Sequence, residues 1–237
     1  HADNQNGAAG KPPYSDLLSV SEDGKVQLTL HLNNYLRLFQ DGLYVALSSQ
    51  IALERRLTTI ADNVANSSTA GFRATGIRFE DVVSGGGEKS VSFVSTGNTY
   101  LSTNSGALRQ TENPLDFAIQ GDAWFAIDTP AGTVMTRDGR FTMLETGQLV
   151  SIEGYPVLDP GGAPIQLDPQ NGAPKAGADG SLRQNDALIG AIGLYEFDAG
   201  EDFRRFGNSG VIPAGAPRAV VDRNDVGVVQ GFVEESN

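Results

Sequence analysis

The chain has 237 residues, of which 39% are hydrophobic and 19% charged, a composition typical of an ordered globular protein with one large or two small domains. Its 29 acidic residues outnumber its 17 basic ones, and the formal net charge of −12 disfavours nucleic acid and anionic membrane surfaces as partners. The sequence has no cysteine, which excludes disulfides, thiol catalysis and thiolate zinc sites.

The N-terminal part of the chain carries weak structural signals. Residues 1–24 are polar and rich in Gly, Asn, Asp and Pro, which predicts a loop or disorder. Alternating apolar residues then predict a strand at Val26, Leu28, Leu30 and Leu32. These residues lack the apolar core of a cleavable secretory signal, and no run in the chain approaches the roughly 20 apolar residues that a spanning helix needs.

The clearest helix is predicted from about Gly42 to Asn66, because no internal Gly or Pro interrupts it. Steps of three and four residues along this helix form a heptad seam, namely Leu43, Ala46, Gln50, Leu53, Leu57, Ile60 and Val64. The seam reaches only the lower limit of length for a coiled coil. The pattern alone therefore favours an amphipathic helix packed on its own domain.

Short polar residues are expected to end this helix at Asn66, and Gly71 permits a positive φ shortly after it. Phe72, Ile77 and Phe79 then predict a short apolar segment that folds back. The three glycines at residues 85–87 indicate a flexible linker.

From Val91 onward the sequence predicts β structure. Apolar runs separated by turn residues lie at 117–119, 124–127, 133–136, 141–144, 147–150, 155–158, 187–197 and 227–233. Asp138–Gly139 predicts a hairpin between the third and fourth of these runs, and Asp179–Gly180 predicts a second turn. The predicted fold class is mainly β with one long N-terminal α-helix, an α+β arrangement with a β-rich central domain of hairpins.

Motifs of known enzyme chemistry are absent from the sequence. It has no phosphate-binding or dinucleotide-binding Gly-rich loop, no zinc-protease helix and no nucleophile elbow, and a Ser-His-Asp triad would depend on His31. The acidic residues Asp122, Asp138 and Asp159 are candidates for a carboxylate pair. Each of them lies beside Gly or Pro, however, where turn formation explains an Asp. We therefore expect no catalytic, cofactor-binding or metal site and no small-molecule substrate.

Three further features have structural interpretations. The segment from Asp222 to Gly227 partly matches a calcium loop, but Val226 and Val233 stand at ligand positions, so we interpret it as a turn. Trp124 is flanked by apolar residues on a predicted strand and is expected in the core. The pairs Arg55–Arg56 and Arg204–Arg205 are expected to be solvated or interface charges.

Three blocks of the sequence resemble flagellar rod and hook proteins. The first block, Gly42 to Val83, resembles the N-terminal signature of that family, with matches at Asn63, Ala65, Asn66, Thr69, Gly71, Phe72 and Arg73. The second block spans residues 113–122 and 136–141 and resembles the family's central β region, with matches at Pro114, Leu115, Asp116, Gly121, Asp122, Arg137, Asp138 and Gly139. The third block is residues 230–237, so the resemblance extends from Gly42 to Asn237.

The resemblance implies a non-enzymatic structural subunit of the basal-body rod. Such a subunit would polymerise with itself and with other rod subunits into the drive shaft for flagellar motility. It would reach the periplasmic rod through the flagellar export apparatus, without a cleaved signal peptide. The resemblance also implies that the seam is for another helix, of the same chain or of a neighbour, which reverses the interpretation from the pattern alone. The modest middle region is most similar to a proximal rod protein, and a distal rod or hook-type protein remains the alternative within the family.

The expected organisation has four segments. Residues 1–41 form an N-terminal extension that we expect to be disordered or non-native, because residues 1–38 match nothing in the family; they are an over-extended start, a fusion remnant or a genuine extension. Residues 42–83 hold the rod helix and the following loop, residues 84–214 the central β domain, and residues 215–237 a return segment. In the family this segment leads to a C-terminal helix, which pairs with the N-terminal one and which this sequence does not show. Because a lone amphipathic helix is marginal, residues 42–66 are expected to be poorly ordered in an isolated monomer and to become ordered on assembly.

Two functions of other classes remain open at this point. A carbohydrate-active β enzyme would need a cleft with two close acids, one of them with a raised pKa. A β-rich surface-binding module with a helical stalk would need exposed aromatic side chains on one face.

Overall fold

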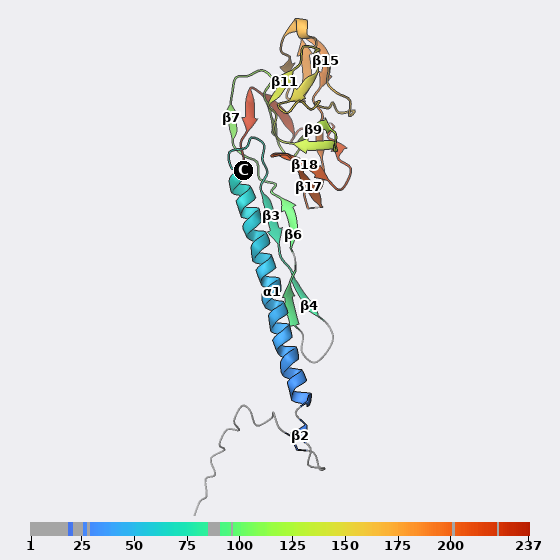
Figure 1. The fold of residues 1–237 in the computed structure, drawn as a ribbon. Helices are drawn as coiled ribbons and strands as arrows, with labels where there is room; N and C mark the ends of the chain where they lie inside the picture. The colour runs from blue at the N-terminus through green and yellow to red at the C-terminus, as the bar shows by residue number, and fades with distance from the viewer. Residues whose placement is uncertain are drawn as a thin grey trace, which may run out of the picture. The chain divides into compact units, whose positions relative to one another are not determined.

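The computed structural model describes residues 19–20, 26–27, 29–84, 91–95, 97–200, 202–221 and 223–237. It is mainly β with one long N-terminal helix, which confirms the predicted fold class (Figure 1). The chain forms two compact units. One unit holds residues 1–54 and 79–96, and the other holds residues 55–78 and 97–237.

Helix α1 spans Thr29–Ala65 and so contributes residues to both units. It ends where the sequence predicts, because the Asn66 and Ser67 amides still donate to carbonyls of the last turn, after which Gly71 adopts a φ of +67°. Its start differs from the prediction, since the helix begins at Thr29 and not at Gly42. The predicted segment boundary between residues 41 and 42 therefore falls inside α1.

The strand predicted from Val26 to Leu32 is wrong at Leu30 and Leu32, whereas Leu28 lies outside the described residues. Strand β2 covers only Val26–Gln27, where it pairs antiparallel with β1 (Ser19–Val20), and Leu30 and Leu32 belong to α1. The reason lies in the spacing of the apolar residues. Leu32, Leu36 and Phe39 precede Leu43 at steps of four, three and four, so they extend the same heptad phase toward the N-terminus.

Two short antiparallel pairs follow the helix. In the first unit, β4 (Asp81–Ser84) pairs with β5 (Val91–Val94), and beyond the paired strands the Ser95 amide donates to the Glu80 carbonyl at 2.8 Å. In the second unit, β3 (Thr75–Arg78) pairs with β6 (Asn98–Leu101). Strand β3 is the predicted segment that folds back after the helix. The linker predicted at residues 85–87 lies outside the described residues.

A six-stranded antiparallel sheet is the largest element of the second unit. Its strands follow the order β17 (Phe203–Phe206), β18 (Gly210–Pro213), β10 (Gly132–Thr136), β9 (Trp124–Thr129), β16 (Leu194–Glu196) and β19 (Arg218–Ala219).

The other strands of this unit form small sheets. A three-stranded sheet has the order β13 (Lys175–Ala176), β14 (Ser181–Gln184) and β15 (Ala187–Ala191). The two-stranded pairs are β11 (Phe141–Met143) with β12 (Leu149–Ser151), β20 (Gly227–Gln230) with β8 (Phe117–Gln120), and β21 (Phe232–Glu234) with β7 (Leu108–Gln110). A single turn of 3₁₀ helix, η1, covers Pro169–Asn171.

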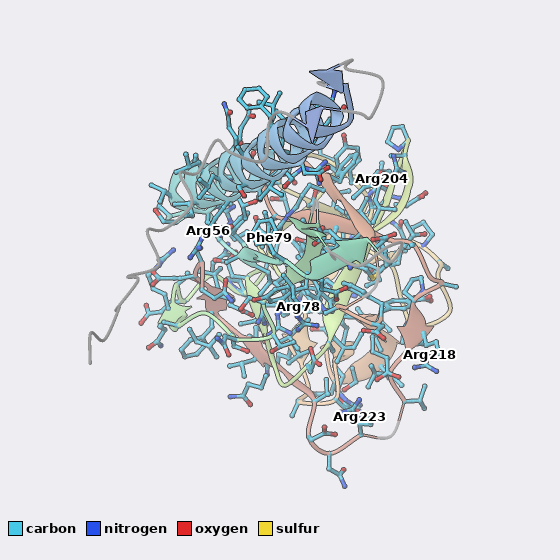
Figure 2. The ribbon with its side chains drawn as sticks, turned by 90° about the horizontal axis from the view of Figure 1, so that it is seen from below. Arg56, Arg78, Phe79, Arg204, Arg218 and Arg223 are labelled. Carbon is cyan, nitrogen blue, oxygen red and sulfur yellow. The ribbon has the colours of Figure 1, made fainter. Side chains whose placement is uncertain are left out.

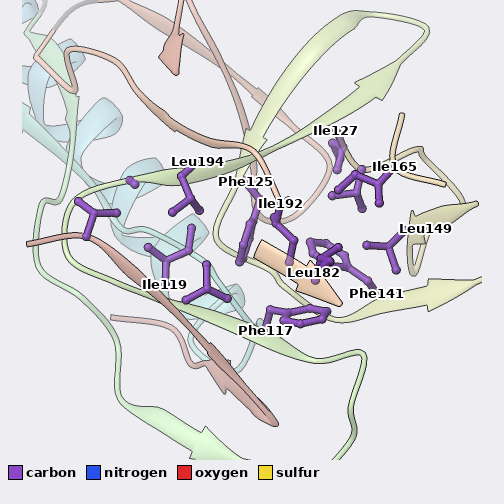
Figure 3. Close-up of a cluster of buried hydrophobic side chains, with 14 of the residues drawn as sticks. Phe117, Ile119, Phe125, Ile127, Phe141, Leu149, Ile165, Leu182, Ile192 and Leu194 are labelled. Carbon is purple, nitrogen blue, oxygen red and sulfur yellow. The ribbon is translucent and has the colours of Figure 1, made fainter. Parts of the chain in front are cut away.

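Strand β9 separates two hydrophobic clusters, because successive side chains of a strand point to opposite faces. Phe125 and Ile127 belong to the larger cluster, in which the Phe125 and Phe141 rings meet edge to face at 5.2 Å (Figure 3). Trp124 and Ala126 belong to the smaller cluster. Trp124 is 5% exposed, which confirms its predicted place in the core.

The hairpin predicted at Asp138–Gly139 is wrong. Strand β10 pairs with β9 and β18, whereas β11 pairs with β12, so the dipeptide joins two different sheets. The Gly139 carbonyl accepts the Phe117 amide at 2.9 Å, and the Phe141 amide donates to the Leu115 carbonyl at 3.1 Å. The backbone groups of Gly139 and Phe141, which a hairpin would pair locally, are thus bonded to residues 115–117. Strands β9 and β10 lie between these two segments in the sequence.

The other turn predictions have mixed outcomes. Asp179–Gly180 does form the turn between β13 and β14, and Gly180 has a φ of +80°. The run predicted as one strand over 187–197 is divided between β15 and β16, which lie in different sheets. The run over 227–233 is divided between β20 and β21 at Gly231, whose φ is also +80°.

Candidate assembly site

The seam of α1 is exposed along its whole length. All seven seam residues are exposed, among them Leu53, Leu57 and Val64 at 61%, 67% and 66%. The side of α1 that is turned away from solvent has mostly small or polar residues, such as buried Ala52 and half-buried Asn63. A row in which most side chains are large, apolar and exposed is characteristic of a surface that another element covers.

Asn63 joins the end of α1 to strand β3 through both atoms of its amide. Its Nδ2 donates to the Thr75 carbonyl at 2.9 Å, and its Oδ1 accepts the Thr75 amide at 3.0 Å. Only a side chain with both a donor and an acceptor makes this pair of bonds. Asn66 acts locally, because it donates to the Asp62 carbonyl and accepts the Thr69 hydroxyl. Ala65 is the one exposed residue among the matched residues of the first block. Its methyl side chain cannot form a hydrogen bond.

Gly71 brings the three blocks of the sequence together. Its amide donates to the Glu234 carbonyl at 2.7 Å. A Cβ at this position would overlap the backbone of Arg137 and Asp138, and its φ of +67° disfavours any other residue. The end of the helix segment, the crossover after β10 and the last strand therefore meet at one glycine.

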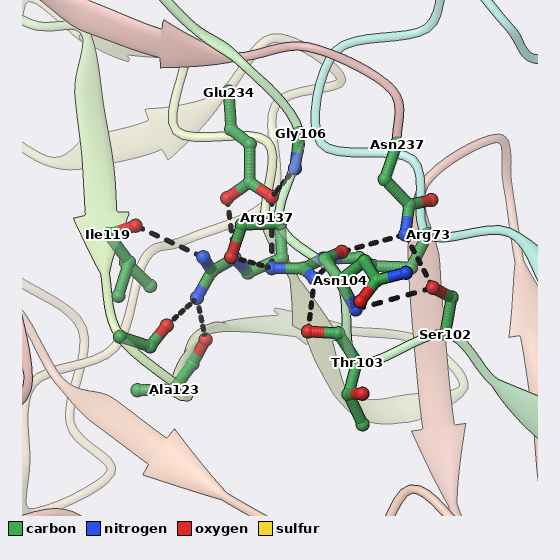
Figure 4. A network of polar contacts seen from close by, with 12 residues as sticks. Arg73, Ser102, Thr103, Asn104, Gly106, Ile119, Ala123, Arg137, Glu234 and Asn237 are labelled. Carbon is green, nitrogen blue, oxygen red and sulfur yellow. Dashed lines mark hydrogen bonds and ion pairs between the residues drawn. The ribbon is translucent and has the colours of Figure 1, made fainter.

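A buried ion-pair network surrounds this meeting point (Figure 4). Glu234 binds Arg137 Nε at 2.7 Å with one carboxylate oxygen and Arg73 Nη2 at 2.9 Å with the other. The same second oxygen accepts the Gly106 amide at 3.0 Å. The three charged side chains are 1–3% exposed. We refer to Gly71, Arg73, Arg137 and Glu234 as the junction.

The two arginines of the junction also satisfy backbone carbonyls. Arg137 donates to the carbonyl of Ile119 in β8 and to those of Gly121 and Ala123 in the turn between β8 and β9. Arg73 donates to the carbonyls of Thr103 and Asn104. Burial lowers the pKa of both arginines, and the carboxylate of Glu234 opposes that shift. Because a buried charge is tolerated only when it is paired and hydrogen-bonded, the network specifies one arrangement of these segments.

Phe72 and Arg205 form a second contact beside the junction. Phe72 is 3% exposed, and the guanidinium carbon of Arg205 lies 4.6 Å from its ring centroid. Arg205 donates to the Arg73 carbonyl and to the Thr75 hydroxyl, and burial lowers its pKa to about 10, against the effect of Asp62. The prediction of a solvated or interface charge is therefore wrong for Arg205. Its neighbour Arg204 is exposed, as are Arg218 and Arg223 on the outside of the β strands (Figure 2).

Asn237 fixes the end of the third block beside the first. Its Oδ1 accepts the Ala74 amide at 2.7 Å, and its Nδ2 donates to the Ser102 hydroxyl at 2.7 Å. The end of the third block therefore lies beside the part of the first block that follows α1.

The matched residues of the second block form hydrogen bonds and turns that fix the chain, and they do not gather reactive groups. The Asp116 carboxylate accepts the Asn113 amide nitrogen, and the Pro114 and Leu115 carbonyls accept Gln230 and Phe141. Gly121 has a φ of +88° and packs against the Asp225 carbonyl. Asp122 is exposed. Of these positions, Gly121 contacts Arg137 directly, through its carbonyl.

The candidate carboxylates have structural roles. Asp138 pairs with Arg140 at 2.6 Å, and Asp159 accepts the Gly161 and Ala163 amides of its own turn at 2.8 Å. Asp138 and Glu153 do line one cavity, but its volume of about 40 Å³ is far below the roughly 300 Å³ of a small ligand site. A larger cavity of about 430 Å³ has Asp62 as its one acid.

The partial calcium loop does not gather ligands in the described part. Asp225 pairs with Arg223, and Asp222 lies outside the described residues. Within the residues that the structure describes, no group of three His, Cys, Asp or Glu side chains could hold a metal ion. In the same part of the chain, α1 is not apolar enough to cross a membrane despite its length.

Two family models match separate parts of the chain. Residues 43–73 match the model of the flagella basal body rod protein, which covers the whole seam and reaches Arg73. Residues 118–184 match the model of the flagellar hook protein FlgE/F/G D1 domain, which covers β8 to β14.

Curated relatives extend the similarity over most of the chain. The flagellar basal-body rod protein FlgF of Mesorhizobium japonicum is 75% identical over 198 residues, which are 84% of this chain and 82% of that protein. FlgF of Rhizobium meliloti is 60% identical with the same coverage. The flagellar basal-body rod protein FlgG of Bacillus subtilis is 31% identical over 83% of this chain and 84% of its own length. With this identity over most of both chains, the protein belongs to the FlgF family of flagellar basal-body rod proteins.

Proposed function

We propose that this chain, a structural subunit of the flagellar basal body, enters the rod by packing the seam of α1 against another helix of the assembly. The exposure of the seam carries the proposal, because residues spaced as in a coiled coil have no covering element in the described chain. Burying a side chain such as Leu57 would contribute about 1.5–3 kcal/mol. Assembly thus supplies the burial that the isolated chain lacks.

The junction has a mechanical role in this proposal. A rod transmits torque, so the base of α1 must keep a fixed orientation relative to the strands beside it. The Asn63 amide pair and the buried contacts of Glu234 provide such a connection within the second unit. The blocks of the sequence that resemble the family would then serve rigidity and not chemistry.

The remaining expectations belong to the same proposal. The subunit acts without catalysis, and its partners are other rod and hook subunits, further copies of itself and the flagellar export apparatus, with no nucleic acid and no membrane insertion. A position in the proximal rod is favoured by the higher identity to FlgF than to FlgG relatives. The 40 Å³ volume of the cavity that holds Asp138 and Glu153 weakens the alternative of a carbohydrate-active enzyme.

The test places a charge in the seam. The full-length gene with Leu57→Asp is introduced into a flagellated strain that lacks its own copy, with Val221→Asp as the control because both residues are 67% exposed. We expect unchanged folding of both purified variants but loss of swimming and of rod incorporation for Leu57→Asp alone. Full swimming with Leu57→Asp would contradict the proposal.

A further inference from the structure

The turn formed by η1 and the residues before β13 holds Asn171, the one asparagine of the described chain that precedes a glycine. Both Asn171 and Gly172 are exposed. Gly172 combines a φ of +69° with a ψ of −160°, a conformation that is essentially restricted to glycine. The backbone therefore requires a glycine after Asn171, and no side chain at position 172 shields the peptide bond between the two residues.

Hydrogen bonds hold the Asn171 side chain at both of its polar atoms. Asn185 Nδ2 donates to Asn171 Oδ1 at 2.7 Å, and Asn171 Nδ2 donates to Asp168 Oδ2 at 2.9 Å. Within the described residues, the Gly172 amide donates to no acceptor, so its nitrogen is not engaged elsewhere. Such a nitrogen and the Cγ of the preceding asparagine can join in a five-membered ring.

We propose that Asn171 is a site of spontaneous deamidation in the folded chain, and that the turn itself promotes the reaction. The Gly172 nitrogen attacks Asn171 Cγ, its proton passes to water, and the side-chain nitrogen leaves as ammonia. Water then opens the resulting succinimide ring at either carbonyl, which gives an aspartate or an isoaspartate at position 171. One amide and one water thus yield one carboxyl group and one ammonia, with no oxidant or reductant.

The two partners of the Asn171 side chain act on the atoms whose charge changes. Negative charge develops on Oδ1 during the attack, and the Asn185 donor stabilises that charge more than it stabilises the neutral amide. The leaving nitrogen gains a proton, and the nearby Asp168 carboxylate favours its positively charged form. Both partners are themselves exposed, so water has access to the ring that it hydrolyses.

The product would disturb the contact that holds the two ends of this turn together. Gln184, which is 3% exposed, accepts the Asp168 amide and donates to the Asp168 carbonyl, both at 2.9 Å, and it also donates to the Gly172 carbonyl. An isoaspartate at position 171 lengthens the backbone between these two ends by one atom. Because Gln184 lies in β14, the turn would then lose its attachment to the three-stranded sheet.

The test is peptide mapping by mass spectrometry of the purified full-length protein after incubation at mildly alkaline pH in water labelled with heavy oxygen. We expect acid at position 171, with an oxygen from the labelled water in its new carboxyl group, to accumulate several-fold faster than acid at Asn208. Asn208 is also exposed but precedes a serine. An Asn171 that keeps its amide, or that reacts no faster than Asn208, would overturn the proposal.

Two glycine variants separate the role of the turn from that of the Asn-Gly dipeptide alone. Asn185 and Asp186 have φ values of +48° and +65°, so glycine fits both positions, but only the Asn185 side chain bonds to Asn171. We expect Asn185→Gly to slow the reaction at Asn171 several-fold and Asp186→Gly to leave its rate unchanged. An Asn185→Gly variant that reacts as fast as the unchanged protein, or faster, would also overturn the proposal, because the turn would then not promote the reaction.

Discussion

Arg137 donates through Nε to Glu234 at 2.7 Å, although the two residues lie 97 positions apart in the sequence. Both side chains are 1% exposed, and the other oxygen of the same carboxylate holds Arg73. One acid thus neutralises part of the charge of two buried arginines that come from the helix-end segment and from the crossover after β10. Residues from all three blocks that resemble the family thus meet at one junction.

Removing the charge of Glu234 should destabilise the protein strongly. Glu234→Gln keeps the shape but leaves two buried guanidinium groups without a counter-charge, and breaking a buried pair in this way costs about 3–5 kcal/mol. The neighbouring Glu235 pairs with Arg109 at the surface, where both side chains are at least half exposed. Glu235→Gln should therefore change stability by about 1 kcal/mol or less. Urea denaturation of the two variants measures the difference, and equal losses would show that the buried network contributes nothing specific.

Substitution of Gly71 tests the close approach of the backbones. Gly71→Ala combines a positive φ with an overlap against Arg137 and Asp138, whereas Gly154→Ala has a φ of +88° and open space around the new methyl group. Both variants carry the conformational cost of a left-handed alanine, about 1–2 kcal/mol. Gly71→Ala should lose about 1–3 kcal/mol more, the usual cost of forcing atoms into a packed site. Thermal unfolding of the pair measures this excess, and its absence would mean that the segments are not packed as described.

The helix itself should be the least stable part of the isolated subunit. Most of its large apolar residues from Leu43 to Val64 are exposed, and most helical stability in proteins comes from packing of an apolar face. Backbone amides of residues 42–66 should therefore exchange with deuterium far faster in a dilute monomer than those of the buried strand β9. Protection of α1 comparable to that of β9 in the monomer would contradict this expectation.

The sequence allowed some of these features to be predicted and concealed others for physical reasons. The seam follows from periodicity, which is a local property, and even its extension through Leu36 and Phe39 could have been read from the same spacing. The partners of Arg137 could not, because ion pairing over 97 positions leaves no local pattern. Asp138–Gly139 carries the signal of a hairpin, but long-range bonds to Leu115 and Phe117 decide its conformation. From the sequence alone, Arg205 is expected to be a surface charge. Only the fold places it against Phe72.

Solvent access to the seam in the finished rod tests the central claim most directly. The chain has no cysteine, so Leu57→Cys introduces a single thiol at a position that is 67% exposed in the subunit, and Val221→Cys provides an equally exposed reference. The measurement is the extent of maleimide labelling of each thiol in the purified monomer and in intact basal bodies. If the seam is the assembly surface, both thiols react in the monomer and only the Leu57→Cys thiol becomes protected in the rod. Equal labelling of the Leu57→Cys thiol in both states would contradict the account.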